Sequence, residues 1–243
     1  AFRRATLVDV ADEILSLRAV KTLPEIAKIT QAAALNDKIW TLARREIRSG
    51  MTEKEIQRVI RGFMNALGDG EAFETIVCAG ANAAECHHVP DATRWNGRDA
   101  ILVDMGVKIG GYCSDMTRCL PPAKPGRLYR EVYSLVKEAN ALAAASLKPG
   151  MTGRDFDAVA RRFLARRGYK KEFGHSLGHG VGIEIHELPG AGRKSKMVLE
   201  PGMSVTIEPG IYIPGKLGVR IEDLAIITAD GCEILTASPK AQI

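Results

Sequence analysis

The chain has 243 residues, of which 46% are hydrophobic and 26% are charged, so it can bury the core of a globular protein. No apolar run approaches the roughly 18 residues of a membrane-spanning helix, and the net charge of +5 is spread along a sequence without RNA-binding motifs. We therefore expect neither a membrane nor a nucleic-acid partner. The five cysteines include no CxxC pair, which indicates reduced thiols in the cytoplasm rather than a disulfide framework.

The first predicted element is an amphipathic helix over residues 8–18. Because the sequence starts with alanine, we expect residues 1–20 to be a linker helix from a missing or processed N-terminal region, and residues 21–243 to form the main domain. A cap at Thr22 predicts a long second helix that ends near Ser49.

The segment after this helix recurs 100 positions later. Gly50-Met51-Thr52 stops one helix and caps the next, with Glu55 completing a capping box, and Gly150-Met151-Thr152 has the same form. The helix that follows ends at Gly68 in one copy and at Gly168 in the other. We predict an α+β fold built from a duplicated unit, with a functional site where the two halves meet.

Two acids occupy a predicted β-hairpin over residues 101–118. If the turn is centred on Ile109-Gly110, Asp104 and Asp115 lie directly opposite each other on one face. Their Cβ atoms would then be roughly 5 Å apart, a distance at which like charges destabilise a sheet. The two residues are either solvated aspartates on an exposed strand or ligands of a cation between them.

Three of the five histidines lie between residues 175 and 187. His175 and His179 have the spacing of a helical zinc motif, but the interspersed glycines argue against a helix and indicate a backbone packed closely against another segment. Together with the paired acids, these two histidines and His186 indicate a metal or acid–base site. Cys86 and His87 could suggest a thiol nucleophile, but neighbouring residues of a strand point to opposite faces.

A second pair of acids lies in a predicted hairpin over residues 203–227. Around a turn at Pro214-Gly215, Glu208 faces Glu222, and Pro209 predicts a bulge. Four carboxylates in one cleft require cations, and an oxygen-rich set with one nitrogen suits Mn²⁺, Co²⁺, Fe²⁺ or Zn²⁺. Two such ions could hold a hydroxide for amide hydrolysis, with these candidate ligands: Asp104, Asp115, His179, Glu208 and Glu222.

These motifs resemble the pita-bread metallopeptidases, specifically the Xaa-Pro branch of aminopeptidase P and prolidase. The resemblance covers residues 17–240 and rests on Val103 to Gly106, Tyr112 to Arg118, His175 to Glu187, Thr206 to Tyr212 and Gly218 to Asp223. It implies a pita-bread catalytic domain over residues 21–243, with pseudo-two-fold symmetry around a curved antiparallel sheet. It also implies cleavage between an N-terminal residue and proline by a hydroxide bridging two metals, with Mn²⁺ expected first, and a homodimer.

The resemblance assigns the five ligands. Asp115 and Glu222 would bridge the two metals, Asp104 would chelate one ion, and His179 and Glu208 would bind the other. The resemblance also makes Glu208 the general base.

Four further residues receive roles from the same resemblance. His87 and His186 would act at the reacting centre, where His186 contacts the scissile amide. His175 would line the substrate pocket, and Arg220 would orient a ligand carboxylate.

Three alternatives stay open. Methionine aminopeptidase shares the fold and ligands, and Cys86 to Pro90 is similar to its Cys-His-Gly motif, but Glu208 to Tyr212 and Gly218 to Asp223 favour the proline-specific branch. A non-catalytic peptide-binding module and a creatinase-like amidinohydrolase are the other two, and the complete ligand set argues against both.

Overall fold

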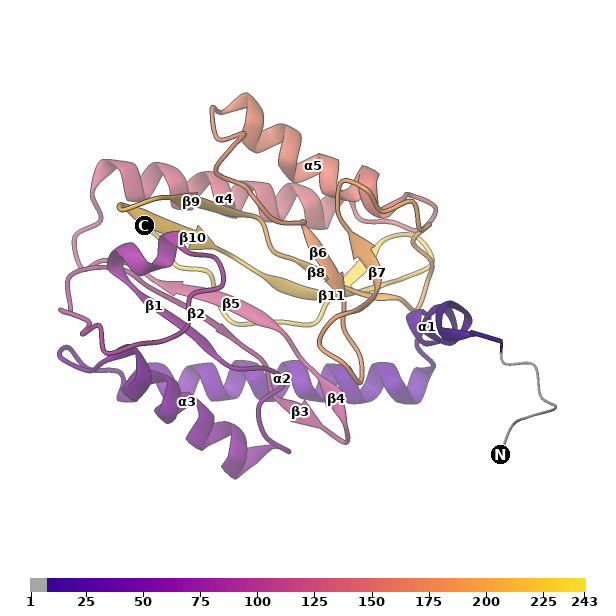
Figure 1. Cartoon of the computed structure of the whole chain (residues 1–243), viewed down its shortest axis with the longest axis horizontal. Coiled ribbons are helices and arrows are strands. Elements are labelled where there is room, and N and C mark those ends of the chain that lie inside the picture. The colour runs from indigo at the N-terminus through magenta and orange to yellow at the C-terminus, as the bar shows by residue number, and fades with distance from the viewer. Residues whose placement is uncertain (1–7) are drawn as a thin grey trace.

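The computed structural model describes residues 8–243, and its helices cover two sides of a set of antiparallel strands. Figure 1 shows α2 and α3 along one side of the strands and α4 and α5 along the opposite side. The helices are α1 (Ala11–Ala19), α2 (Leu23–Glu46), α3 (Glu53–Leu67), α4 (Arg127–Ser146) and α5 (Gly153–Arg166), with a short 3-10 helix η1 (Gly80–Ala84).

The strands form several small antiparallel sheets. One has the order β1-β2-β5, one β12-β11-β8, and the pairs β9-β10, β3-β4 and β6-β7 complete the set among the described residues. Their bounds are β1 (Ile76–Ala79), β2 (Ile101–Met105), β3 (Lys108–Ile109), β4 (Tyr112–Cys113), β5 (Met116–Leu120), β6 (Gly178–Gly180), β7 (Glu187–Ala191), β8 (Ser204–Ile207), β9 (Gly210–Ile213), β10 (Leu217–Arg220), β11 (Asp223–Ile227) and β12 (Cys232–Ile234). The predicted α+β class is confirmed.

The two halves repeat the same local structure. The helices α2 and α4 end at Glu46 and Ser146, a few residues before the expected glycine stops. Gly50 and Gly150 lie in the turns that follow, where both have a left-handed φ, of 91° and 87°, that a side chain would strain. Thr52 and Thr152 then cap α3 and α5, each hydroxyl accepting a backbone N–H three residues on at 3.1 Å. The duplication expected from the 100-residue offset is therefore visible in the helix pairs.

The first hairpin has a different register from the predicted one. Its turn falls at Gly110-Gly111, where both φ angles are positive, as a two-residue hairpin turn requires. Asp104 therefore pairs with Thr117 rather than with Asp115. The predicted turn was displaced by one residue, which shifts the pairing by two positions, so the two aspartates still point to the same face.

The second hairpin has the predicted register. Ile207 pairs with Asp223, and Gly210 pairs with Arg220, on the two sides of a short interruption. Since the register is the same before and after it, Glu208 and Glu222 face each other there, and the bulge expected at Pro209 is absent from this part of the described chain.

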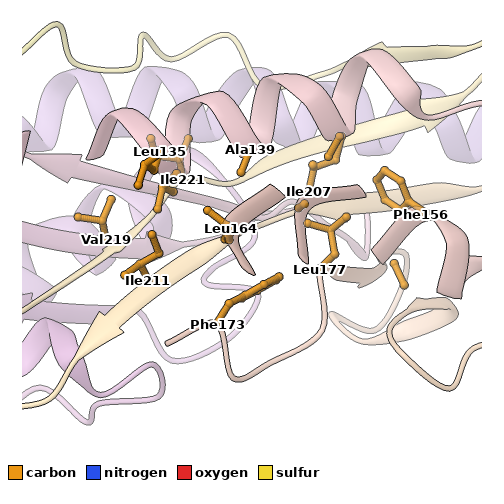
Figure 2. Packing of buried hydrophobic residues seen from close by; sticks show 14 of the residues in the cluster. Leu135, Ala139, Phe156, Leu164, Phe173, Leu177, Ile207, Ile211, Val219 and Ile221 are labelled. Carbon is orange, nitrogen blue, oxygen red and sulfur yellow. The ribbon is translucent and has the colours of Figure 1, made fainter. Parts of the chain in front are cut away.

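Each half contributes its own hydrophobic cluster. Figure 2 shows α4 and α5 packed on the second hairpin, with Leu135 and Ala139 from α4 facing Ile207 and Ile221. The cluster of the first half lies between α2, α3 and the β1-β2-β5 sheet, and includes Trp40, Ile60 and Val103. Burial of each large side chain contributes about 1.5–3 kcal/mol, so the two hairpins are held against their helices.

Helix α1 is joined to the rest of the chain by ion pairs. Arg18 of α1 and Lys21, which follows the helix, both bind the carboxylate of Glu187 in β7.

The predicted segment 1–20 lies partly outside the described residues, since these begin at residue 8, and its separation from 21–243 stays a prediction. Across residues 8–243, no helix combines the length and apolarity that a bilayer crossing needs.

Candidate metal centre

One cleft of about 400 Å³ gathers every site residue predicted from the sequence. Its lining comes from the two hairpins, from the loop after η1 and from the segments around β6. The predicted residues that line it are Asp104, Asp115, His87, His175, His179, His186, Glu208, Arg220 and Glu222.

Three of the four acids lie where the hairpin ladders are interrupted, and the fourth, Asp104, lies within β2. Asp115 lies between β4 and β5, Glu208 between β8 and β9, and Glu222 between β10 and β11. An interruption leaves backbone carbonyls without ladder partners, and buried asparagines from the long helices donate to them. The Nδ2 of Asn140 in α4 donates to Ile207 O at 2.8 Å, and that of Asn36 in α2 donates to Met105 O at 2.8 Å.

His179 is placed by glycines on either side of it. A Cβ at Gly178 would lie 2.0 Å from Thr206 O, and one at Gly180 would lie 2.2 Å from Leu188 O, so the close packing that the glycines predicted is present. The backbone N–H of His179 donates to the Thr206 hydroxyl at 3.0 Å. These contacts fix β6 beside β8 and aim the imidazole at the acids.

The imidazole of His179 presents a lone pair to two carboxylates. Its Nδ1 donates to Gly180 O at 3.1 Å, and burial lowers its pKa to about 4, so the ring is neutral with Nε2 unprotonated. That nitrogen lies 3.5 Å from Asp115 Oδ2 and 3.5 Å from Glu208 Oε1. Unprotonated Nε2 cannot donate a hydrogen bond, and its position suits a cation shared with the two oxygens.

The buried acids repel one another strongly. Burial, and then the charges of Glu222, Asp104 and Glu208, raise the pKa of Asp115 well above its ordinary value. Glu222 is raised by burial and by the charges of Glu208 and Asp104. Burial also raises the pKa of Glu208 to about 8, so the cleft needs positive charge to hold all its carboxylates ionised.

Two oxygens are also left without partners. Asp104 Oδ1 and Asp115 Oδ1 are buried and accept no hydrogen bond from any residue of the described chain. Ligand atoms of Asp115, His179 and Glu222 all lie within 4.8 Å of one another. The orphaned oxygens, the lone pair of His179 and the mutual repulsion of the acids all fit the binding of divalent cations.

Arg220 connects the acids to the rest of the site. From β10, its Nη2 donates to Asp104 Oδ2 at 2.7 Å and its Nε to the Thr117 hydroxyl at 2.9 Å. Thr117 in turn donates to Glu222 Oε2 at 2.6 Å. One buried guanidinium therefore holds a carboxylate from each hairpin, directly in one case and through a hydroxyl in the other.

Comparison with known proteins agrees with this geometry. Residues 27–229 match the model of metallopeptidase family M24. The chain belongs to metallopeptidase family M24. It is 40% identical over 240 residues to the uncharacterized peptidase YqhT of Bacillus subtilis (strain 168). The aligned region covers 98% of this chain and 68% of that protein.

Solved structures of the same family superpose closely on this M24 chain. The X-Pro aminopeptidase of Thermotoga maritima MSB8 matches with a TM-score of 0.92 and 40% identity, over 95% of this chain and 66% of that one. The prolidase of Pyrococcus furiosus matches with a TM-score of 0.93 and 40% identity, over 95% of this chain and 69% of that one. The M24 chain thus has the pita-bread fold and spans about two thirds of the length of these relatives.

The remaining predicted histidines line the same cleft from exposed positions. His186 is exposed and packs edge-on against His179, with ring centroids 4.3 Å apart. His87 is exposed on the opposite rim, in the loop after η1. The η1 helix before that loop packs tightly on β10, since a Cβ at Gly218 would lie 1.6 Å from Ala83 O.

Sequence reasoning missed two residues of this M24 site, Tyr212 and Thr117. The Tyr212 hydroxyl accepts from Arg220 Nη1 at 2.8 Å and contacts His175 Nε2 at 2.8 Å, and Thr117 bridges Arg220 to Glu222. Both lie in motifs that carried the resemblance. The sequence did hold a signal for Tyr212, because it lies on the same predicted strand as Glu208 and at a position that points to the same face.

A second histidine and acid group lies behind the rim. Glu53, at the start of α3, accepts from His88 Nε2 at 2.7 Å and from Asp91 N at 3.0 Å with one oxygen. Its other oxygen accepts from Ala79 N at 2.7 Å and Asn82 Nδ2 at 2.9 Å. Because its oxygens are already satisfied, this group is a brace for the loop that carries His87 rather than a second cation site.

Proposed function

We propose that this chain cleaves the bond between an N-terminal residue and proline, as an Xaa-Pro aminopeptidase or dipeptidase. The observation that carries the proposal is the gathering of four acids and the unprotonated His179 nitrogen in one cleft. The likeness to an X-Pro aminopeptidase and a prolidase, at TM-scores of 0.92 and 0.93, supports proline specificity.

The proposed ligands are those assigned from the sequence. Asp115 and Glu222 would be shared between two cations, with Asp104 completing one site and His179 and Glu208 the other. Divalent ions in such a site supply Lewis acidity toward the peptide carbonyl and an activated water. We propose Mn²⁺ as the first ion to test, because the oxygen-rich set suits it, followed by Co²⁺, Zn²⁺ and Fe²⁺.

The protein side chains would orient the peptide and move protons. Glu208 would accept the proton of the attacking water, and Thr206 donates to its Oε1 at 3.3 Å. His186 would donate toward the scissile amide from its exposed position, and His87 would contact the substrate from the other rim.

His175 would form part of the proline pocket as a neutral ring. Its Nδ1 donates to Ser176 O at 2.7 Å and its Nε2 accepts from Tyr212. Burial lowers its pKa to about 3. A neutral ring of fixed orientation suits an apolar proline better than a charged one would.

Compartment and assembly remain proposals. The five cysteines are free thiols, which supports the reducing cytoplasm. A homodimer is proposed from the sequence resemblance alone.

The test uses protein stripped of metal and reloaded with Mn²⁺, Co²⁺ or Zn²⁺. Ala-Pro and Ala-Pro-Ala are the expected substrates, and their relative rates decide between dipeptidase and aminopeptidase activity. Cleavage of Met-Ala-Ser in preference to both would make the protein a methionine aminopeptidase. Binding of Ala-Pro-Ala without turnover of any peptide under any metal would indicate a non-catalytic module.

A further inference from the structure

Two further hollows continue from the metal cleft along α5. The first, of about 450 Å³, shares His175, Ser176 and Gly190 with the cleft. The second, of about 620 Å³, shares Arg161 and Arg193 with the first. Together they form a groove that leads away from the reacting centre on the side of the proposed proline pocket.

The groove is positively charged. Its exposed cations, which define what we call the basic groove, are Arg162, Lys170, Lys171, Arg193 and Lys194. None of them forms an ion pair with another residue of the described chain, whereas neighbouring Arg154 and Arg167 do approach acids. Solvent screening leaves each single charge weak, but several unpaired charges of one sign in a concave surface reinforce one another.

Arg161 lies in the wall of the groove but is committed to structure. It donates to both carboxylate oxygens of Asp157, at 2.6 and 2.7 Å, and to His175 O at 2.6 Å. Glu172, which follows Lys171 in the sequence, is half-buried, and its carboxylate accepts the backbone N–H of Lys171 at 3.1 Å. The charge of Arg161 is balanced by Asp157, and the five groove cations keep their excess.

We propose that the basic groove binds acidic side chains of the substrate peptide downstream of the proline. This inference rests on the proposed function. In a peptidase that releases one N-terminal residue, every other residue of the substrate lies on the C-terminal side of the scissile bond. A groove that extends away from the cleft can therefore hold only the downstream part. Acidic residues in that part would meet the unpaired cations.

The test compares two C-terminally amidated hexapeptides on Mn²⁺-loaded protein, Ala-Pro-Ala-Ala-Ala-Ala and Ala-Pro-Ala-Glu-Glu-Ala. Exposed ion pairs are individually weak, so we expect kcat/KM to favour the acidic peptide by about three- to tenfold at low salt. The preference should fall toward one at about 0.5 M NaCl, where the Debye length is only a few ångström. Equal kcat/KM at low salt would overturn the inference.

The variant Arg162→Gln/Lys170→Gln/Lys171→Gln removes three groove charges and leaves the metal cleft intact. It should lose the acidic preference and cleave Ala-Pro, which does not reach these residues, at the wild-type rate. The matched control Lys38→Gln/Arg44→Gln/Arg45→Gln removes three exposed charges from α2 on the opposite side of the molecule. Loss of the preference in this control would show a net-charge effect and overturn the assignment to the groove.

Binding separates this inference from the activity. Fluorescence anisotropy of the labelled acidic peptide on metal-free protein should show tighter binding than that of the neutral peptide, and the triple groove variant should abolish the difference. If no peptide is cleaved but the acidic peptide binds in this way, the proposed activity fails and the groove stands. If a short single-stranded RNA binds there instead and the acidic peptide shows no advantage, the groove is a nucleic-acid surface and the inference is wrong.

Discussion

The hydroxyl of Tyr212 lies 2.8 Å from Nε2 of His175 and joins that ring to the Arg220 guanidinium. The contact depends on Gly210, because a Cβ at that position would lie 2.5 Å from the hydroxyl. The proposed proline pocket is therefore mechanically connected to the carboxylates of Asp104 and Glu222 through one tyrosine and one arginine.

Tyr212→Phe should weaken substrate binding without removing metal. It deletes the acceptor of Arg220 and the donor to His175, and each hydrogen bond is worth about 0.5–1.5 kcal/mol, so kcat/KM should fall about tenfold, mainly through KM. Steady-state kinetics and metal analysis check this. Tyr169→Phe, which removes an exposed hydrogen bond to Glu131, is the control and should behave like wild type. Metal loss in Tyr212→Phe would show that the tyrosine supports the ligands instead.

Asp115→Asn should abolish activity and lower metal content while stabilising the metal-free protein. The aspartate is buried among like charges, so a neutral amide relieves repulsion that exists whenever cations are absent. Metal analysis and thermal unfolding with and without chelator measure both effects. Normal turnover in this variant would contradict the ligand assignment.

His186→Ala should lower kcat and leave metal content near that of wild type. The imidazole of His186 is exposed and packs edge-on against the ring of His179. Its removal therefore leaves the Nε2 lone pair of His179 in place. Turnover and metal stoichiometry of the same preparation provide the measurement. Loss of metal would make His186 a ligand.

The pair of His88 and Glu53 should make stability depend on pH. Burial acts to lower the pKa of His88, but the hydrogen bond and charge of Glu53 outweigh it and raise the pKa above 6.5. A histidine with a raised pKa stabilises the fold fully below its unfolded value, and this contribution is lost as pH rises through the folded value. The unfolding free energy of wild type relative to His88→Gln should therefore decrease from pH 6 upward. A difference that is constant with pH would mean that the pKa of His88 is the same in the folded and unfolded states, and a difference that increases with pH would mean that folding lowers it.

Asn140→Ala should destabilise the fold more than Asn36→Ala. The Asn140 amide donates to Ile207 O and Ile221 O and accepts from Lys240, whereas Asn36 donates to Met105 O. Leaving buried carbonyls without donors costs about 1–3 kcal/mol, and denaturant unfolding measures it. Equal effects would show that neither the contact to Ile221 O, at 3.4 Å, nor the bond from Lys240 contributes to stability.

The sequence by itself determined most of the elements and the members of the site. Capping threonines, glycines with obligatory left-handed φ and the 100-residue offset depend on local chemistry, so both helix pairs could be predicted. The alternation of side chains along a strand placed Asp104 and Asp115 on one face even though the turn was displaced by one residue, because a shift of two positions preserves the face.

Only the tertiary structure decided how the site is held together. The bond of Arg220 to Asp104, the carbonyls reached by Asn36 and Asn140, and the brace of Glu53 on His88 join residues from 35 to more than 110 positions apart. Neither spacing nor propensity encodes such contacts, because they arise only when segments far apart in the sequence pack against each other. The positive charge of the basic groove also emerges only then, since its cations come from two segments, residues 162–171 and 193–194, that the fold brings together.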